Sequence, residues 1–448
     1  MLGLTVGLLI LAVLPIILLR PHVGILTWNW VGLMNPHKMT WGFLSSGAQF
    51  SLQIALLTSI ATLFSSEKKN FPKNSITVLF IIFSVWITIT TFMAHNPAAA
   101  WQDWERTMKI FFITFLTIIL MQKRERLHAL VWVVVISMGY FGATNGLETI
   151  LTGGRYIVWG PPGTFIADNN QLAMAMIMTL PLIRYLQLSS DLRLIKLTMT
   201  GLMILTVFSI LGSHSRGAFL GLIAVTTMLI LKSRNRGRLA LLTICLLGVA
   251  AAFVPDHWVN RMETLENVEE DRSAMGRIRA WIFNFRLAVE NPVFGGGFNA
   301  YQDRDLFLRL VPEAPHNANA HSIYFEVLGE HSFIGLALFL SLGIACWRRL
   351  NRIRKMTKDD ANLRWAYDLA SMVQVSLIGY FSAGAFLNLA FFDYYYILLS
   401  FAVVLFEIIA PKQTLARTVN GQATPTLSSS VRTAQHAPPI ASRRPRAG

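Results

Sequence analysis

The chain has 448 residues, of which 54% are hydrophobic and only 14% are charged. A soluble globular protein of this length needs more charged residues to cover its surface, so the composition excludes an ordinary soluble fold. The formal net charge is +15. Because the basic residues gather in loops between apolar segments, we interpret this charge as a signal of membrane topology and expect no nucleic-acid partner.

Apolar segments of membrane-spanning length follow one another along the chain. Lipid satisfies no backbone polar group, so such segments cross a membrane as helices. We therefore expect an all-α polytopic membrane protein with about twelve transmembrane helices in a bundle over residues 1–410. The stretch 23–36 is too short to cross and should be interfacial or re-entrant. The expected spans are residues 2–19, 43–64, 75–93, 107–121, 127–151, 169–187, 197–213, 217–231, 239–254, 321–346, 365–386 and 393–410.

Basic residues divide the loops between these spans into two alternating sets. The positive-inside rule places the basic set, and with it both chain termini, in the cytoplasm. Residues 411–448 are rich in Pro, Ala, Ser and Arg and should form a disordered cytoplasmic tail that can touch membrane lipids. The basic loops are residues 65–73, 122–126, 191–196, 232–238 and 347–358.

Polar motifs gather in the opposite, periplasmic set of loops. One long loop, residues 255–320, should form a periplasmic subdomain with an amphipathic helix in AMGRIRAWIFNFRLAVENP, which would lie on the membrane surface or cap a cavity. The FGGGFNAY that follows predicts a flexible turn, because its spacing does not fit a nucleotide-binding loop. The apolar positions of the helix are Ile278, Trp281, Ile282, Phe285, Ala288 and Val289.

Four residues in these motifs are candidate site residues. Arg216 stands at the start of a predicted helix, where free N–H groups and the helix dipole favour anions, and its planar donor fork suits a phosphate. Arg277 and Arg279 lie on the polar face of the amphipathic helix. His321 begins a long apolar helix, whose N-terminus disfavours a protonated ring, so His321 would be available as a neutral base. The plainer alternatives are interfacial arginines and a hydrogen-bonded structural histidine.

The loop before His321 adds two secondary candidates, His316 and Asn317. His316 and His321 are five residues apart with no acidic cluster beside them, and the chain has no Cys/His ligand spacing, so we expect no metal. It has no P-loop, and we expect no cofactor. There is no ATP pool outside the cytoplasm, so a synthetic reaction there needs a donor activated in advance, such as a lipid pyrophosphate.

Three ordered motifs carry a resemblance to a known family. They are SRGAF at 215–219, GRIRAWIFNFRLAVENPVFGGGFNAY at 276–301 and AHSIYFEVLGEHSFIGL at 320–336. In this order and spacing they resemble the O-antigen ligase and polymerase superfamily of bacterial inner-membrane proteins. The first hundred residues look like the subgroup of O-glycosylation ligases.

The resemblance implies a GT-C-like fold and an inverting, metal-independent glycosyl transfer at the periplasmic face. The implied donor is a glycan on undecaprenyl pyrophosphate, and the implied acceptor is a sugar hydroxyl of lipid A-core, with a growing glycan or a protein Ser/Thr as alternatives. His321 matches the catalytic histidine, and Arg216 and Arg277 match the pyrophosphate-binding arginines, with Arg279 as an alternative to Arg277. The rival classes are a transporter of lipid-linked glycans, for which only Lys109 stands out as an intramembrane charge, and a non-catalytic scaffold.

Overall fold

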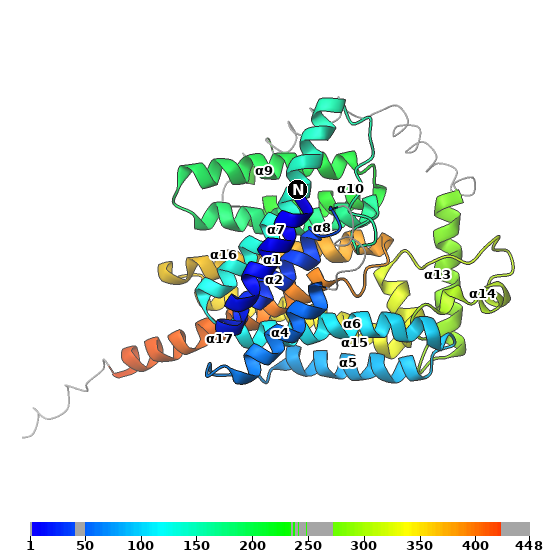
Figure 1. The fold of residues 1–448 in the computed structure, drawn as a ribbon, viewed down its shortest axis with the longest axis horizontal. Helices are drawn as coiled ribbons and strands as arrows, with labels where there is room; N and C mark the ends of the chain where they lie inside the picture. Colours follow the sequence, from blue (N-terminus) through cyan, green and yellow to red (C-terminus); the bar gives the residue numbers. More distant parts are fainter. Residues whose placement is uncertain are drawn as a thin grey trace, which may run out of the picture. The chain divides into compact units, whose positions relative to one another are not determined.

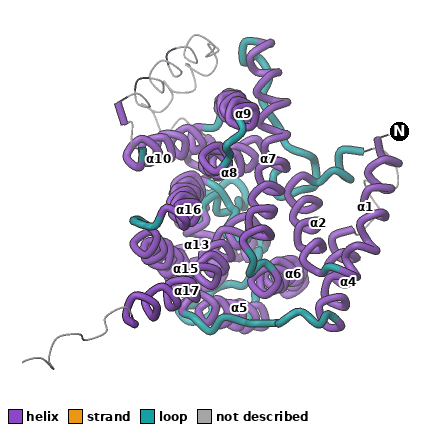
Figure 2. Tube along the Cα trace, turned by 90° about the vertical axis from the view of Figure 1, so that its left-hand side faces the viewer, coloured by secondary structure: helices purple, strands orange, loops and turns teal. Residues whose placement is uncertain are grey.

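The computed structural model of the chain describes residues 2–40, 50–233 and 272–422, and between the last two ranges only four isolated residues. In this part of the chain every regular element is a helix, which confirms the all-α class (Figures 1 and 2). The α-helices are α1 (Leu2–Leu19), α2 (Pro21–Met34), α4 (Phe50–Phe64), α5 (Ser75–Phe92), α6 (Pro97–Leu120), α7 (Arg124–Thr152), α8 (Asn169–Ser189), α9 (Arg193–Gly212), α10 (Arg216–Lys232), α13 (Arg272–Glu290), α14 (Arg304–Leu310), α15 (Ile323–Thr357), α16 (Arg364–Ala383) and α17 (Asp393–Gln422). Short 3-10 helices are η1 (Ala300–Gln302), η2 (Ala361–Leu363) and η3 (Gly384–Phe386).

Seven helical segments of the described chain are long and apolar enough to cross a membrane, as expected of a multi-pass membrane protein. They are α5, α7, α8, α9, α15, α16 with its flanking 3-10 turns, and α17 as far as Ala410. Helices α1 and α4 contribute shorter apolar stretches, and α6 and α10 are not among the seven. The expected span at 239–254 lies outside the described residues, so the count of twelve stays a prediction.

Helix α8 occupies the middle of the bundle and packs against α7, α9, α10 and α16 (Figure 2). Helices α7 and α9 approach closely because α7 presents glycines to its neighbour. A Cβ added at Gly146 would come within 2.0 Å of the Leu205 carbonyl oxygen, and one at Gly142 within 2.3 Å of the Thr206 hydroxyl. Small residues allow this kind of backbone approach between membrane helices.

Helix α2 differs from its expected place. The stretch 23–36 was expected to be interfacial or re-entrant, but α2 packs against α1, α4 and α7, and residues on several of its faces are buried. Trp28, which suggested an interfacial belt, is only 7% exposed. Aromatic residues near membrane interfaces and aromatic residues inside a bundle have the same composition, so the sequence alone did not separate the two cases.

The segment before α15 forms a small core of its own. Helices α13 and α14 lie side by side (Figure 1), and the rings of Phe283 and Phe307 stack with centroids 4.3 Å apart. Residues 255–271 of the expected subdomain lie outside the described part. The core residues are Phe283, Leu287, Ala300, Leu306, Phe307, Leu310, Val311 and Ala314.

The buried surface of α13 only partly matches the face expected from its apolar spacing. Ala288 of that face is buried, as are Phe283 and Leu287 outside it, whereas Phe285 and Val289 are 49% and 54% exposed. The helix packs against both α14 and α15, so its buried residues lie on more than one side. The exposed side chains of Phe285 and Val289 suit contact with an apolar phase such as lipid.

Residues 1–408 form one compact unit and residues 409–448 a second. Helix α17 extends to Gln422, so the expected boundary between bundle and tail at residue 410 falls inside a helix. Residues 423–448 lie outside the described part of the chain.

Candidate active site

His321 lies two residues before α15, between the loop 311–320 and the helix. Its φ angle is 44°, in the left-handed region that non-glycine residues rarely adopt. The ring is half-buried, and the next residue, Ser322, is the N-cap of α15 and is fully buried. An unusual backbone angle next to a buried residue persists only where the surroundings hold it, which is common at functional sites.

Trp281 of α13 is the main contact that holds this turn. Its Nε1 donates to the carbonyl oxygen of Ala320 at 2.8 Å, and its ring stacks on Phe325 with an interplanar angle of 8°. Trp281 therefore contacts the chain on both sides of His321. This contact docks α13 against the start of α15.

Arg277 lies one helical turn before Trp281, on the same side of α13. Burial lowers the pKa of His321 below its ordinary value of 6.5, the positive charge of Arg277 lowers that pKa further, and the Asp168 carboxylate opposes both effects. Because the net shift is downward, His321 is neutral at pH 7 and can accept a proton. The structure thus brings His321 and Arg277 together.

Arg216 is the first residue of α10, in a turn that several contacts fix. The Ser215 hydroxyl accepts from the Ala218 N–H at 3.1 Å, and Asn169 donates to the Ser213 carbonyl oxygen at 2.7 Å. His214 in this turn adopts φ 54°. These contacts join the start of α10 to the start of α8.

The two arginine-bearing helices share one neighbour, Phe386. A Cβ added at Gly217 would lie 3.0 Å from the Cβ of Phe386, so α10 begins directly against this side chain. The ring of Phe386 lies 6.5 Å from that of Trp281. The N-terminal turn of α10 and helix α13 therefore both approach Phe386.

The remaining candidates from the sequence lie differently. Arg279 is half-buried, and its Nε is buried without a hydrogen-bond partner among the described residues. His316 is exposed. The Asn317 amide donates to the Tyr301 carbonyl oxygen at 3.0 Å, which gives it a structural contact inside the loop.

Asp168 is a site residue that the sequence reasoning did not single out. It caps α8 by accepting from the Asn170 N–H at 2.9 Å, and its charge acts on His321. An Asp at a helix N-cap is common without any other role, so the sequence alone does not mark this residue. Its effect on His321 appears only in the folded chain.

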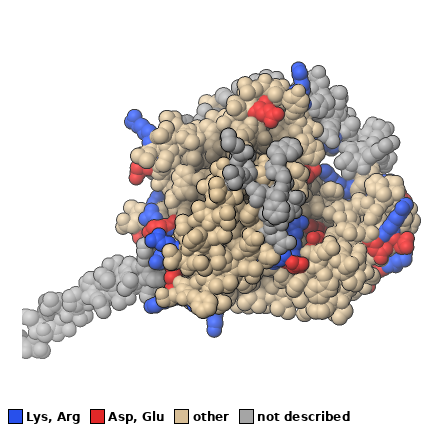
Figure 3. All heavy atoms as spheres, in the orientation of Figure 1, with Lys and Arg blue, Asp and Glu red and all other residues tan. Residues whose placement is uncertain are grey.

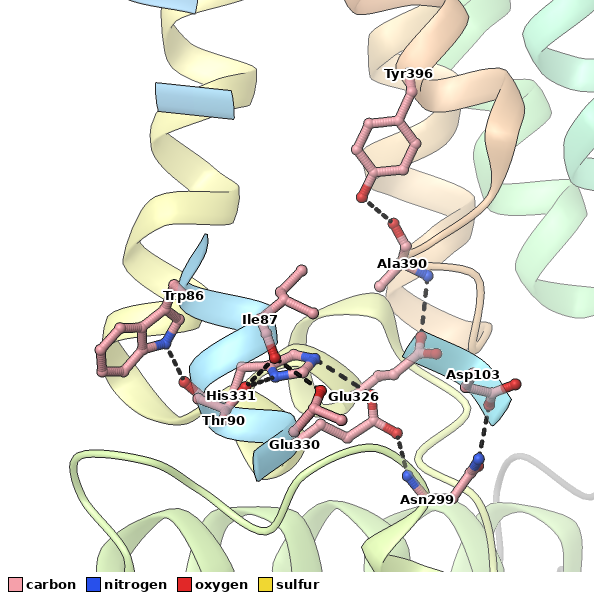
Figure 4. Close-up of polar contacts among 11 residues, drawn as sticks. Trp86, Ile87, Thr90, Asp103, Asn299, Glu326, Glu330, His331, Ala390 and Tyr396 are labelled. Atoms are coloured by element: carbon pink, nitrogen blue, oxygen red, sulfur yellow. Dashed lines mark hydrogen bonds and ion pairs between the residues drawn. The ribbon is translucent and has the colours of Figure 1, made fainter. Parts of the chain in front are cut away.

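Two glutamates of α15, Glu326 and the buried Glu330, lie four residues apart in the polar contacts of Figure 4. One oxygen of Glu326 accepts from the Ala390 N–H at 3.0 Å, and one oxygen of Glu330 accepts from the Asn299 N–H at 2.9 Å. The Asn299 amide in turn donates to Asp103 of α6 at 2.7 Å. A carboxylate pair had not been expected, although the spacing of four residues in an apolar helix was a usable signal. The pair ties α15 to two loops and to α6.

His331 is fully buried, as its position in the helix predicts. Its Nδ1 lies 2.6 Å from the Thr90 hydroxyl, and its carbonyl oxygen accepts from the Trp86 indole at 3.1 Å (Figure 4). The Nε2 atom lies 3.9 Å from an oxygen of Glu330, and neither atom has a hydrogen-bond partner. This distance is too long for a hydrogen bond, so both atoms are buried polar groups without a partner among the described residues.

The glycine motif after α13 is a packed loop and not the flexible turn that we expected. Helix α15 is interrupted at Ser332, whose φ is 66°, and the N–H groups of Gly296 and Gly297 donate to the carbonyl oxygens of Gly329 and Glu330 at 2.8 Å each. Carbonyl groups at a helix end need donors from outside the helix. The glycine loop supplies them.

Replacing Gly297 by alanine is expected to lower the free energy of unfolding by about 2–5 kcal/mol, combining a left-handed backbone penalty with overpacking. Its φ is 75°, and an added Cβ would lie 2.2 Å from the Cβ of Ala94. Gly153 provides the control, because its φ is 63° but nothing lies within 4 Å of the added atom. Thermal unfolding in detergent should show a large loss for G297A and only about 1–2 kcal/mol for G153A; equal losses would contradict the packing described.

Basic and acidic side chains gather around a recess on the face of the molecule that Figure 3 shows. Within the described residues, no group of three or more His, Cys, Asp or Glu side chains could hold a metal ion. A neutral imidazole beside a guanidinium suits proton removal next to a developing anion.

Lys109, the charge that could have marked a transport path, forms an ion pair with Glu105 at 2.5 Å on α6, and its side chain is 47% exposed. It is therefore not an isolated buried charge. This placement weakens the observation that had kept a transporter among the alternatives.

Comparison with known families divides the chain into two parts. Residues 201–340 match the O-antigen ligase family, and residues 1–190 match a family of unknown function (DUF5935). Arg216, Arg277 and His321 fall within the first of these regions and Asp168 within the second. No curated protein matches the chain.

Proposed function

We propose that the chain, whose residues 201–340 match the O-antigen ligase family, transfers a glycan from undecaprenyl pyrophosphate to a sugar hydroxyl of lipid A-core. The reaction takes place on the periplasmic face of the bacterial inner membrane, with both chain termini in the cytoplasm. The observation that carries the proposal is the neutral His321 next to Arg277, at the end of an apolar helix.

In the proposed reaction His321 removes the proton of the acceptor hydroxyl as its oxygen attacks the anomeric carbon. The new bond forms between these two atoms while the bond from the anomeric carbon to the pyrophosphate oxygen breaks, and the electron pair leaves with the pyrophosphate. Attack opposite the leaving group inverts the anomeric configuration. Arg216 and Arg277 stabilise the departing pyrophosphate, for which the guanidinium fork is suited, and Arg279 is the alternative to Arg277.

The activity of the wild-type protein should decrease as the pH is lowered from 8, because protonated His321 cannot act as a base. The pKa of His321 is lowered from 6.5, so the midpoint of the decrease should lie below that value. Initial transfer rates at saturating donor and acceptor measure it. A midpoint above pH 6.5 would contradict the proposed environment of the ring.

The acceptor is the part of the proposal that most needs a direct test. Purified protein would be given lipid-linked glycan together with lipid A-core, with a second lipid-linked glycan, or with a Ser/Thr-rich protein substrate. Product only with lipid A-core supports a ligase, and product only with the second glycan indicates a polymerase. Since the first hundred residues resemble O-glycosylation ligases, transfer to protein is the second candidate. Movement of the lipid-linked glycan across a vesicle membrane without any transfer would favour a transporter.

A further inference from the structure

A second cavity lies outside the site around His321. It has a volume of about 200 Å³ and is bounded by α2, α4, α6 and the loop residues 163–165, with Asp393 at the start of α17. All of its lining residues except Asp393 fall within residues 1–190, the region of the DUF5935 match. The site derived above uses none of these side chains.

Arg106 is an exposed residue whose guanidinium lines this cavity. Its guanidinium lies 3.3 Å from the centre of the Phe165 ring, and the nearest carboxylates, Asp103 and Asp393, act on it only through their charge. Among the described residues no acceptor is hydrogen-bonded to it. A guanidinium carries five N–H donors in a fixed plane, and one that faces a cavity is well suited to a ligand with several oxygens.

Asp393 supplies the matching acceptor. Its side chain is only 5% exposed, and its Oδ1 atom is buried without a hydrogen-bond partner among the described residues. Its other oxygen, Oδ2, would lie 3.4 Å from a Cβ added at Gly32, which also lines the cavity. The carboxylate can therefore accept a hydrogen bond from a hydroxyl group of a ligand in the cavity.

The rest of the lining limits the kind of ligand. Trp28 and Ile110 provide apolar walls, and Asn35 adds an amide. The charge of Lys109 at the rim is balanced by Glu105, so the cavity offers no cluster of unpaired cations to a phosphate. Apolar walls combined with one donor fork and one acceptor match a ring that has apolar faces and hydroxyl groups along its edge.

The loop 163–168 connects this cavity to the histidine. Phe165 lines the cavity, and Asp168 acts on His321. Three residues of chain span at most about 10 Å, so the backbone at the cavity lies within this distance of the backbone at Asp168. A chain of sugars that reacts at His321 can therefore reach the cavity with a neighbouring unit.

We propose that this cavity is a second sugar subsite, which binds a sugar residue of the glycan other than the one whose anomeric carbon reacts. Asp393 accepts a hydrogen bond from a sugar hydroxyl, Arg106 donates to neighbouring hydroxyl oxygens, and Trp28 lies against an apolar face of the ring. This inference rests on the proposed glycan transfer. It gives the first 190 residues a function in substrate selection.

The test measures binding separately from transfer. The probe is the free oligosaccharide released from the lipid-linked glycan by mild acid, and calorimetry in detergent measures its dissociation constant. R106M and D393N should bind at least about tenfold more weakly than wild type, because each loses hydrogen bonds to a charged group. A55L should do the same by filling the cavity that Ala55 lines, and it removes no charge.

Two controls separate the possible failures. R309M removes an exposed arginine that pairs with Glu290 and should bind like wild type, as should H321A. Equal binding by wild type, R106M and A55L, each with an unchanged unfolding temperature, would overturn the subsite. Phosphatidylglycerol vesicles can be added as a competitor. If they displaced the oligosaccharide from A55L as readily as from wild type, this result would also overturn the subsite. Binding with the expected losses, but without transfer by wild type, would retain the subsite and reject the proposed reaction.

Transfer kinetics provide a second readout. With a donor of several sugars, R106M should raise the donor KM about tenfold and leave kcat nearly unchanged, because the lost contact is equally present in the ground and transition states. With a donor of one sugar, R106M and wild type should have the same KM. An equal effect on both donors would contradict a subsite for a second sugar.

Discussion

Replacing His321 by alanine is expected to lower the rate of glycan transfer by about 10²–10⁴-fold, the usual contribution of a positioned general base. The acceptor hydroxyl would then have to attack without losing its proton to a nearby group. The measurement is the initial rate with purified H321A, lipid-linked glycan and lipid A-core at saturating concentrations. The residual activity should also lack the decrease below pH 6.5, because the titrating ring is absent.

His95 offers a matched control for this variant. It is an exposed histidine in contact with Asn291 at 3.4 Å, and H95A should transfer at the wild-type rate. Circular dichroism and the unfolding temperature of H321A should remain close to wild type, since the ring is only half-buried. Near-wild-type transfer by folded H321A would refute the role of the base and with it the proposed mechanism.

Replacing Arg277 by methionine should have the second-largest effect, a decrease in kcat of about 10²–10³-fold, typical of losing one donor to a developing anion. R277K should be impaired less but clearly, because lysine keeps the charge without the bidentate fork. Rates at saturating donor measure both. R309M serves again as the control for loss of an arginine away from the site.

R277M should also change the pH profile of transfer, which would not happen if Arg277 had only a structural role. The Arg277 charge lowers the pKa of His321, so its removal in R277M should move the midpoint of the acid decrease to higher pH. R277K should keep the midpoint near its wild-type position. An unshifted midpoint in R277M would mean that the guanidinium does not act on the ring.

The course of the helices could largely be predicted from the sequence, because apolar length and capping residues are local properties. Asn74 caps α5, and Asn96 followed by Pro97 begins α6, as their positions before apolar segments suggest. The expectation was wrong where tertiary packing determines which side chains are buried. Phe285 of α13 was assigned to the apolar face but stays exposed, because the helix packs through Phe283.

The candidate site was predictable only in part, for the same reason. Arg216, Arg277 and His321 could be found because ordered motifs resemble a family, and the pKa of His321 reflects Arg277 nearby. Asp168 could not be found, since its N-cap position explains its residue type equally well. The cavity with Arg106 depends on helices far apart in the chain, whose contacts leave no local pattern.

The interruption of α15 at Ser332 separates a short first helical segment, which follows His321, from the rest of the helix. The nine residues from Ile323 to His331 form a helical segment about 13 Å long. The backbone of the glycine loop is hydrogen-bonded to the C-terminal end of that segment. Because a short helix moves as a rigid body, a displacement of its C-terminal end also displaces its N-terminal end next to His321. A shift of the 295–297 loop would therefore move His321 relative to Arg277, and we expect such a shift to change the rate of the proposed transfer.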